Sequence, residues 1–323
     1  NEMIQLAEKA KTENRLLNAA FYYRGAEFFT DPTDPDKISL YDQFIELFNR
    51  SIKNDEVERF SIPYEDGYLL ALRLPPKESR GTIIIHGGFD SFMEEFYSMA
   101  RYLRDNDYEV ILFEGPGQGA ALRRYNLTLN YEWEKSVSTV LDFFNFENVT
   151  LIGISLGGYL CLRAAAFEPR IARVVAFGIL YHYPLKNGTI YYLLMKIIMK
   201  TRNARSFINN SAQKQIKTNL AAQWGINHGM FITGTKTPYD YVTYMWQLSA
   251  ENLHSSRIKQ DVLLLHGEKD HFAPLKLYYK QKKALINAKS VTGRIFTREE
   301  QAQNHCQVGN IKLALDYILH WIP

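Results

Sequence analysis

Apolar residues in the first 50 positions recur at three- and four-residue steps, which is the spacing of one face of an α-helix. Between Glu2 and Phe29 the apolar positions on this spacing are Leu6, Ala10, Leu17, Ala20, Tyr23 and Ala26. A turn rich in Asp and Pro at 31–36 ends this helix, and a second stripe then follows at Tyr41, Phe44, Ile45 and Phe48. The pattern predicts a helical hairpin within residues 1–54. Two helices cannot bury their apolar faces alone, so we expect the hairpin to pack on the rest of the chain or to help form a lid, with a tetratricopeptide-like unit as the alternative.

The period of the pattern changes from helical spacing to alternation at Val57. Two alternating runs, 57–64 and 68–74, flank Glu65-Asp66-Gly67 and predict an antiparallel β-hairpin. Beyond it, short apolar runs alternate with helical segments. These runs are Thr82–Ile85, Val110–Phe113, Val149–Ile154, Val174–Phe177, Val262–His266 and, more weakly, Val291–Phe296. Such alternation predicts an α/β fold, a mainly parallel sheet flanked by helices, built from residues 55–180 and 258–323.

The regular spacing of strands fails between residues 181 and 257. Roughly 75 residues precede the next apolar run, far more than the 2–6 residues of a simple connection. We therefore expect a helical cap insertion over 181–257. Aromatic and amide side chains are frequent in it, and they suit either a substrate pocket or packing of the cap on the core. They include Tyr191, Tyr192, Trp224, Asn227, His228, Tyr239, Tyr241, Tyr244 and Trp246.

Composition and charge narrow the classes of partner. The 323 residues are 46% hydrophobic, and the formal net charge is only +3 without a long Lys/Arg block. We therefore expect a small-molecule substrate and neither nucleic acid nor a membrane as partner, while a homodimer is left open. The apolar run 190–199 is about half the ~20 residues that a membrane span needs and is interpreted as a buried or lid helix.

Two features of the chain bear on its compartment. Cys161 and Cys306 are too few for a disulfide framework, which favours a reduced, cytoplasmic setting. The first residues, Asn1-Glu-Met-Ile-Gln-Leu, lack a basic region followed by an apolar core, so we expect no signal peptide there. The expected location is the cytoplasm.

A candidate nucleophile follows the apolar run at 149–154. The sequence Gly153-Ile-Ser155-Leu-Gly157 places Ser155 between a predicted strand and a predicted helix. A serine hydroxyl is a weak nucleophile, and it becomes reactive when a strained turn exposes it beside a base and backbone N–H groups. Gly-x-Ser-x-Gly alone is a common pattern that also occurs in structural loops. The other polar residues at strand ends therefore decide its meaning.

An acid and a base follow later strands in the expected order. Asp270 ends the run 262–270, and His305 lies in the polar loop 301–309 before the last helix. The order Ser155, Asp270, His305 is that of a nucleophile, orienting acid and base triad, in which the base takes the serine proton. Asp270 can also act as a simple helix cap.

Three other residues compete for roles in this constellation. His271 is an alternative base, but it adjoins the acid and is predicted to begin a helix. His266 lies inside a strand and is expected to be a core histidine. Cys306 is a weaker candidate nucleophile, because it adjoins His305 whereas a nucleophile and its base normally come from separated segments. We expect a packing or loop role for Cys306.

A glycine-rich loop follows the run 82–85. His86-Gly87-Gly88-Phe89 leaves backbone N–H groups accessible, and the N–H of Gly88 or Phe89 together with that of Leu156 would form an oxyanion hole. A tight glycine turn without a catalytic role is the alternative.

A second glycine-rich loop, residues 113–119, follows the next predicted strand. Its spacing weakly imitates a dinucleotide-binding loop, but Pro116 and the missing acidic residue argue against that reading. A turn beneath the active site fits better, with Glu114 and Gln118, and also Tyr159, as candidate substrate contacts. We expect no cofactor and no metal.

These motifs together resemble the α/β-hydrolase superfamily. The motifs are His86-Gly-Gly-Phe-Asp-Ser, Phe113-Glu-Gly-Pro-Gly-Gln-Gly, Gly153-Ile-Ser-Leu-Gly-Gly, Gly267-Glu-Lys-Asp-His-Phe-Ala-Pro and Asn304-His-Cys-Gln-Val-Gly-Asn. They are most similar to the branch that contains fermentation-respiration switch esterases, dihydroxypseudooxynicotine hydrolases, fungal polyketide-shortening hydrolases and acylaminoacyl-peptidase-like relatives. The resemblance implies an α/β-hydrolase fold, a Ser155-Asp270-His305 triad, a helical cap after the sixth core strand, and an N-terminal helical segment that adds to the lid.

The leading functional hypothesis is a serine hydrolase that forms an acyl-enzyme on a small carbonyl substrate, which is an ester, a thioester or an acyl-amide or acyl-peptide. A carbon-carbon bond hydrolase of the same fold is one alternative. A catalytically silent binding or regulatory protein is the other.

Overall fold

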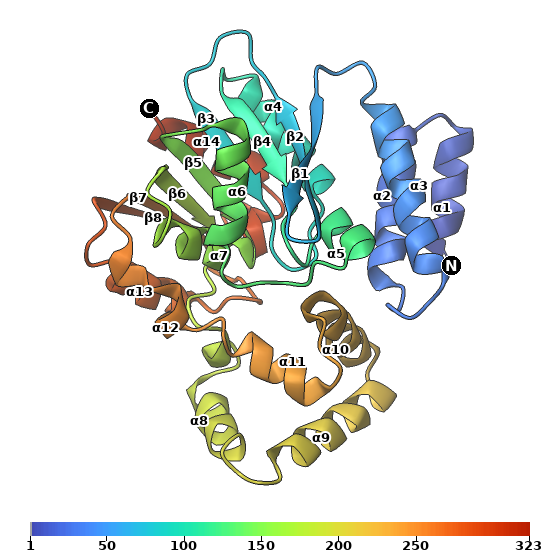
Figure 1. Ribbon diagram of the computed structural model, residues 1–323, viewed down its shortest axis with the longest axis vertical. Coiled ribbons are helices and arrows are strands. Elements are labelled where there is room, and N and C mark those ends of the chain that lie inside the picture. The colour runs from blue at the N-terminus through green and yellow to red at the C-terminus, as the bar shows by residue number, and fades with distance from the viewer. Residues whose placement is uncertain (1) are drawn as a thin grey trace.

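An eight-stranded sheet forms the centre of the computed structural model, which describes residues 2–323 (Figure 1). The strands are β1 (Glu58–Tyr64), β2 (Gly67–Leu74), β3 (Thr82–His86), β4 (Glu109–Phe113), β5 (Val149–Ile154), β6 (Ile171–Phe177), β7 (Asp261–Gly267) and β8 (Ser290–Phe296). Their order is β1-β2-β4-β3-β5-β6-β7-β8, and β2 is antiparallel to both of its neighbours while all later strands run parallel. The predicted β-hairpin and mainly parallel sheet are confirmed.

Helices cover both faces of the sheet, as the continuous apolar strands require. Successive side chains of a strand point to opposite faces, so Ile83 and Ile85 pack in one apolar cluster and Ile84 in the other. The first cluster includes residues of α4 (Tyr97–Arg104) and α14 (Ile311–Trp321). The second includes residues of α5 (Gly119–Tyr125), α6 (Glu134–Phe144), α7 (Gly157–Ala165) and α13 (Leu275–Ala284).

The N-terminal segment consists of three helices, so the prediction of one helix over 2–29 was wrong. These helices are α1 (Glu2–Thr12), α2 (Leu16–Phe29) and α3 (Asp36–Ser51). The break lies at Asn14, whose φ of +55° is left-handed. Asn tolerates this conformation, and the polar run 11–15 supplies no apolar side chain to continue the buried stripe. The turn expected at 31–36 does separate α2 from α3.

The three N-terminal helices pack beside the sheet, next to the loop after β3. Aromatic rings make the junction: Phe44 lies 5.5 Å from Phe92 and Phe48 lies 5.5 Å from Tyr97, measured between ring centroids. Phe92 directly precedes the short 3-10 helix η1 (Met93–Phe96). The N-terminal helices therefore contact the segment that leads out of β3.

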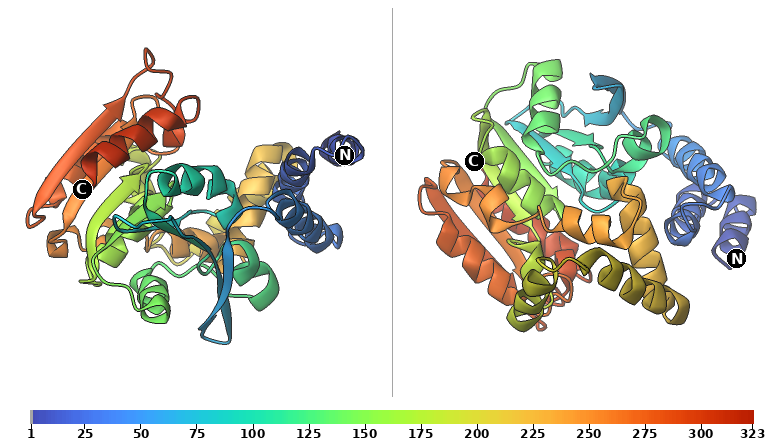
Figure 2. Two further views of the ribbon diagram at one scale, coloured as in Figure 1. Left: turned by 90° about the horizontal axis from the view of Figure 1, so that it is seen from above. Right: turned by 60° about the horizontal axis from the view of Figure 1, so that its bottom comes forward.

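Five helices intervene between β6 and β7. They are α8 (Thr189–Ile198), α9 (Ala204–Thr218), α10 (Leu220–Thr233), α11 (Pro238–Met245) and α12 (Ala250–Leu253), with 3-10 turns η2 (Tyr183–Leu185) and η3 (Ser255–Arg257). Side-chain caps begin three of them: Asn219 accepts from the N–H of Ala222, Thr237 from that of Asp240, and Ser249 from that of Asn252. Figure 1 and the right-hand view of Figure 2 show α8–α11 gathered at one end of the sheet.

The apolar run 190–199 was interpreted as a buried or lid helix, and the first of these alternatives was wrong. Its residues form α8, and Ile190, Leu193, Leu194 and Ile197 expose 51–78% of their surface. Only Met195 of this helix is buried. Within residues 2–323 no helix has both the length and the apolar character required to cross a bilayer.

Candidate active site

Ser155 occupies a sharp turn between β5 and α7. Its φ of +62° is left-handed, a conformation that a non-glycine residue adopts at a cost and that pushes the side chain out of the strand-to-helix turn. The turn is held by two backbone hydrogen bonds, from the N–H of Ser155 to the carbonyl of Phe177 (2.8 Å) and from the N–H of Gly158 to the carbonyl of Ser155 (2.9 Å). Gly153 permits this close approach, since a Cβ there would lie 2.0 Å from the carbonyl oxygen of Gly157.

The structure brings Ser155, His305 and Asp270 together in one hydrogen-bonded chain. Ser155 Oγ lies 2.8 Å from His305 Nε2, and His305 Nδ1 lies 2.7 Å from Asp270 Oδ2. Asp270 follows β7, and His305 begins the 3-10 turn η4 (His305–Gln307) after β8. The three residues are far apart in sequence, but parallel strands end at the same edge of the sheet, which brings their following loops together.

Asp270 and His305 shift each other's titration. The Asp270 side chain is fully buried, which alone would raise its pKa, but the hydrogen bond from His305 lowers the pKa below its ordinary value. Burial of His305 disfavours the imidazolium, yet hydrogen bonds with Asp270 and Cys306 outweigh burial and raise the pKa of His305. The carboxylate is thus the group that stabilises a proton on His305.

The loop after β3 lies against the start of α7. A Cβ at Gly88 would come within 2.6 Å of the backbone nitrogen of Leu156, so only glycine allows the two segments to approach. The N–H of Gly88 donates to Ser91 Oγ at 3.0 Å. No acceptor engages the N–H groups of Phe89 and Leu156 anywhere in residues 2–323. Of the two loop donors considered from the sequence, Phe89 is the one left for an oxyanion.

Three side chains expected to contact substrate do not line the cavity beside Ser155. Gln118 is buried, accepts from the N–H of Gly115 and donates to the carbonyl of Gly88 (2.9 Å). Glu114 is buried and accepts from the N–H of Ala120 (2.8 Å), and the hydroxyl of Tyr159 donates to the carbonyl of Ser249 (2.9 Å). These predictions were wrong, because all three side chains are buried and form hydrogen bonds with backbone groups of neighbouring loops and helices. Gln118 instead fixes the loop that carries Phe89.

The competing residues of the sequence interpretation lie in other surroundings. His266 is fully buried in β7 with its ring centroid 5.7 Å from that of Tyr278, in the role of a core histidine. His271 is exposed, and its ring centroid lies 6.4 Å from that of His305. Cys306 is buried with its Sγ directed at the carbonyl of Phe177 (3.6 Å). Ser155 remains the side chain that contacts the base as a nucleophile would.

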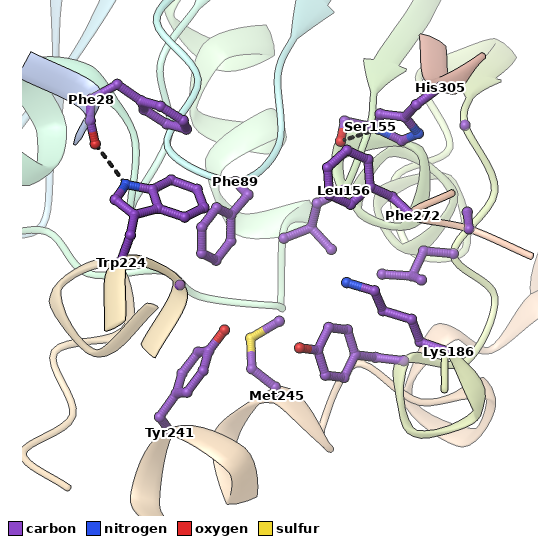
Figure 3. A pocket seen from close by; sticks show the side chains of 15 residues that line it. Phe28, Phe89, Ser155, Leu156, Lys186, Trp224, Tyr241, Met245, Phe272 and His305 are labelled. Atoms are coloured by element: carbon purple, nitrogen blue, oxygen red, sulfur yellow. Dashed lines mark hydrogen bonds between the residues drawn. The ribbon is translucent and has the colours of Figure 1, made fainter. Parts of the chain in front are cut away.

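A cavity of about 440 Å³ opens beside Ser155 (Figure 3). Most of its lining is apolar or aromatic, and it comes from three parts of the chain: the N-terminal helix α2, the loops at the sheet edge, and the helices between β6 and β7. The lining residues are Phe28, Phe89, Ser155, Leu156, Gly178, Leu180, Tyr183, Lys186, Trp224, Gly225, Tyr241, Met245, Phe272, Ala273 and His305. Of the aromatic residues singled out in 181–257, only Trp224 and Tyr241 line it.

The N-terminal helices and the inserted helices meet at one end of the cavity. The indole N–H of Trp224 in α10 donates to the carbonyl of Phe28 in α2 at 2.8 Å, and the two rings lie 4.9 Å apart (Figure 3). Asn227 donates to Asp31 at 2.9 Å. The aromatic end of the cavity therefore forms only when both parts are in place.

A buried ionic cluster, Asp90-Arg123-Glu27-Arg24, lies behind the loop that carries Phe89. Asp90 directly follows Phe89, and both of its carboxylate oxygens accept hydrogen bonds of 2.6 Å from Arg123. Arg123 also pairs with Glu27 of α2 (2.7 Å), and Arg24 donates to Glu27 and to the carbonyl of Asp90 (both 2.7 Å). Attraction from Arg123 and a hydrogen bond from it lower the pKa of Asp90, against the effect of burial.

His228 of α10 closes this cluster from the side of the inserted helices. Its Nε2 lies 2.8 Å from Asp90 Oδ2, and this contact is a further cause of the lowered pKa of Asp90. The ring stacks on Trp224 at 5.2 Å. The cluster thus joins α2, α5, α10 and the Phe89 loop, and sequence reasoning missed it because nothing in the local pattern marks these charges as buried.

Lys186 is the other functional candidate that the sequence did not reveal. It follows η2 and its side chain extends into the cavity (Figure 3). The local sequence around it, Tyr183-Pro-Leu-Lys-Asn-Gly, reads as an ordinary turn. For metals, residues 2–323 contain no group of three or more His, Cys, Asp or Glu side chains arranged to hold an ion.

Comparison with known families and proteins agrees with this architecture. A family model described as "alpha/beta hydrolase fold" matches residues 83–296. The match begins in β3 and ends with β8, and it includes Ser155 and Asp270.

Similar proteins occur in fungi. Hydrolase LUC6 of a Fusarium species and 20-hydroxy-prefusarin hydrolase FUS2 of Gibberella moniliformis are each 31% identical to this chain, over 279 and 280 residues. In both cases the similarity covers 79% of this chain and 66% of the relative. The chain therefore spans just under two thirds of the length of these relatives.

Two solved structures share the fold over nearly the whole chain. AbyA5 matches with a TM-score of 0.73 and 17% identity, covering 99% of this chain and 86% of its own. The 2,6-dihydroxy-pseudo-oxynicotine hydrolase matches with a TM-score of 0.69 and 20% identity, covering 98% and 85%. At these identities the likeness concerns the fold, including its N-terminal helices.

Proposed function

The chain belongs to the alpha/beta hydrolase fold family, and from that premise we propose that it is a serine hydrolase acting through an acyl-enzyme on Ser155. The observation that carries the proposal is the hydrogen-bonded chain from Ser155 Oγ through His305 to Asp270, with distances of 2.8 and 2.7 Å. Both distances are within the reach that proton transfer requires. Catalysis by such an arrangement needs no metal or cofactor.

The first half of the reaction forms the acyl-enzyme. Ser155 Oγ attacks the carbonyl carbon of the substrate while its proton passes to His305 Nε2, and Asp270 stabilises the resulting imidazolium. The negative charge that develops on the carbonyl oxygen is bound by the N–H groups of Phe89 and Leu156. The tetrahedral intermediate then breaks its bond to the leaving group, which departs with the proton from His305.

The second half releases the acid. A water molecule gives its proton to His305 as its oxygen attacks the acyl carbon, and the same two N–H groups bind the oxyanion. The bond to Ser155 breaks, His305 returns the proton to Ser155 Oγ, and a carboxylic acid leaves the cavity. The left-handed backbone of Ser155 supports this sequence of steps, since it presents the hydroxyl to His305 Nε2 beside the entry of α7.

The cavity suits a small, largely apolar carbonyl compound. Its volume of about 440 Å³ lies in the range of ordinary small-molecule sites. An ester, a thioester or an acyl-amide of this size is the proposed substrate class. The hydrolase names of the fungal relatives support this proposal. In the proposed enzyme, the helices between β6 and β7 form the cap over the substrate.

A fluorophosphonate probe tests the proposed nucleophile directly. Wild type should be labelled at Ser155, whereas Ser155→Ala should not, and p-nitrophenyl butyrate should be hydrolysed by wild type at least 10³-fold faster than by Ser155→Ala or His305→Ala, on the order of the loss seen when a triad member is removed. Labelling that persists in Ser155→Ala would refute the assignment. Equal slow turnover by all three proteins would favour the catalytically silent alternative.

A 1,3-diketone added to the substrate panel distinguishes carbon-carbon cleavage from ester hydrolysis. Cleavage of the diketone without turnover of any ester, still dependent on Ser155, would favour the carbon-carbon bond hydrolase.

A further inference from the structure

Fifteen residues line the cavity, and Lys186 is the only one of them that is a Lys, Arg, Asp or Glu. Its side chain extends into the cavity, with the Nζ 5.5 Å from the centre of the Phe272 ring (Figure 3). The remaining walls are apolar or aromatic, apart from Ser155, His305 and the tyrosine hydroxyls. A single cation therefore faces the space that the substrate would fill.

No carboxylate in residues 2–323 pairs with Lys186. Its Nζ makes cation–π contacts with two rings, at 5.5 Å from the centroid of Phe272 and 5.7 Å from that of Tyr183. Burial lowers the pKa of Lys186, and the more distant Asp270 carboxylate only partly opposes this shift. A partly desolvated ammonium without a counter-ion is costly, and the cost is removed when an anion joins it.

Three other buried cations of this protein, unlike Lys186, have a carboxylate partner. Arg24, Lys37 and Arg123 are almost fully buried, and each forms an ion pair with Glu27 at 2.7–3.0 Å. The chain thus supplies carboxylates wherever cations are buried for stability. Lys186, which is half-buried in a cavity, lacks such a partner, as expected for a group whose partner comes with a ligand.

The position of Lys186 couples it to the catalytic residues. The Phe272 ring that it approaches lies 5.0 Å from the ring of His305. One side chain therefore separates the ammonium from the base. A molecule small enough for the cavity can contact Ser155 and Lys186 at the same time.

We propose that Lys186 forms a subsite for an anionic oxygen of the substrate, so that the preferred substrates combine an apolar or aromatic body with one carboxylate or enolate. This proposal rests on the proposed function, because it assumes that the cavity holds the substrate of a hydrolase. Binding of an anion by Lys186 does not itself require turnover. The aromatic end of the cavity, formed by Phe28, Phe89 and Trp224, takes the apolar body, and Lys186 takes the charge.

Binding to the inactive Ser155→Ala protein tests the subsite without catalysis. The probes are ω-phenylalkanoates with two to six methylene groups and their neutral amides, measured by isothermal titration calorimetry. At least one carboxylate should bind ten-fold or more tightly than its amide. The preference should disappear when Lys186→Met is added and persist with Lys186→Arg. Lys200→Met removes an exposed charge from the same insertion and serves as the matched control, with no expected change.

Hydrolysis by the active enzyme gives the second readout. Two substrate pairs are used, mono-p-nitrophenyl adipate with its methyl ester, and 4-carboxyphenyl butyrate with its methyl ester, so that the charge lies on the acyl part or on the leaving part. Wild type should favour the charged member of at least one pair, mainly through KM, and Lys186→Met should lose 10- to 100-fold in kcat/KM on that member but less than three-fold on the neutral twin.

Distinct results separate this proposal from the serine-hydrolase assignment. Failure of the fluorophosphonate to label Ser155 would refute the proposed function while the calorimetric preference could still stand. Binding of every carboxylate no better than its amide, or a preference that survives Lys186→Met, would overturn the anionic subsite. An equal loss by Lys186→Met on charged and neutral substrates would also overturn it, because it would indicate a structural role.

Discussion

Asp270 uses its two carboxylate oxygens for two different tasks. Oδ2 accepts from His305 Nδ1, while Oδ1 accepts from the backbone N–H groups of Phe272 and Ala273, each at 2.9 Å. Asp270 does not cap a helix, since α13 begins only at Leu275 with Pro274 as its N-cap, and that alternative of the sequence analysis was wrong. Oδ1 instead stabilises the turn after β7, and this turn holds Oδ2 against His305 Nδ1. Phe272, held by this turn, packs edge-on against the His305 ring, with the centroids 5.0 Å apart.

At the residue scale, Asp270→Asn should lower kcat/KM by about 10³–10⁴-fold, because the base loses its orientation and the imidazolium its stabilising charge. The residual activity should show a shifted pH profile. His305 must be neutral to accept the Ser155 proton, and the Asp270 carboxylate raises its pKa. Removing that charge lowers the pKa, so the acid limb of the kcat/KM profile should move to lower pH.

The control for this measurement is His271→Gln, which replaces the exposed histidine beside Asp270. Its kcat/KM profile should superimpose on that of wild type. An acid limb that stays in place in Asp270→Asn, or moves in His271→Gln, would contradict the assignment of His305 as the titrating base.

At the element scale, α5 places two adjacent arginines in opposite surroundings. The Arg123 side chain is 2% exposed and pairs with Asp90 and Glu27, whereas the adjacent Arg124 is 45% exposed and pairs with Asp42 of α3. Adjacent residues on a helix point about 100° apart, so one faces the junction with α2 and the other faces solvent. The first links three elements behind the Phe89 loop, and the second is an ordinary surface ion pair.

Arg123→Met should therefore destabilise the protein by about 3–5 kcal/mol, since it leaves Asp90 and Glu27 buried with less compensation. The same change at Arg124 should cost less than about 1 kcal/mol. Urea unfolding followed by circular dichroism measures both variants. Under conditions where it remains folded, Arg123→Met should also hydrolyse p-nitrophenyl butyrate more slowly than wild type, because Asp90 directly follows Phe89, the proposed oxyanion donor. Equal stability losses in the two variants would contradict the importance of the buried cluster.

At the scale of the whole molecule, the site exists only where three parts of the chain meet. The sheet supplies Ser155, Asp270 and His305, the inserted helices supply Trp224, and α2 supplies Phe28. The hydrogen bond from Trp224 to the carbonyl of Phe28 joins the last two parts across nearly 200 residues of sequence. The N-terminal helices are thus part of the cavity wall rather than an appendage.

Two buried carboxyl groups make the stability of the whole molecule depend on pH. Burial raises the pKa of Glu114 to about 7, against the hydrogen bonds that it accepts from Ala120 and Met93, and burial beside Glu114 also raises the pKa of Glu94. The folded state therefore holds these protons more tightly than the unfolded chain does. The free energy of unfolding should fall as the pH rises from about 4.5 to about 7, where the Glu114 proton is lost from the folded state.

Glu114→Gln should weaken this pH dependence, because the amide cannot ionise. Its one oxygen can keep the 2.8 Å hydrogen bond from Ala120, and the amide nitrogen then replaces the oxygen that accepts the longer, 3.4 Å bond from Met93. Unfolding by urea at several values between pH 5 and pH 8 measures it. Wild type should lose stability over this range more steeply than the variant. Glu46→Gln, which changes an exposed carboxylate of α3, should retain the wild-type slope. A Glu114→Gln slope equal to that of wild type would show that the buried carboxyl is not the titrating group.

The family resemblance and most of the sheet could be predicted from the sequence, since each depends on local patterns. Each predicted run of four to six residues became a strand, and in all but the weakest, 291–296, most of its residues are buried, as a parallel sheet covered on both faces requires. The order Ser155, Asp270, His305 was also readable, as each residue follows a strand. Local patterns gave the wrong result at Asn14, where a polar run broke the first helix, and in α8, where an apolar run faces solvent.

The sequence by itself determined which elements form and which residues end the strands, because hydrophobic period and chain order are properties of neighbouring residues. Only the tertiary structure decided which of the polar side chains face one another. It buried Arg123 and exposed Arg124, turned Glu114, Gln118 and Tyr159 away from the cavity, and directed Lys186 into it. These outcomes depend on contacts between segments distant in sequence, and the burial of a charge is decided by the partners that those contacts bring.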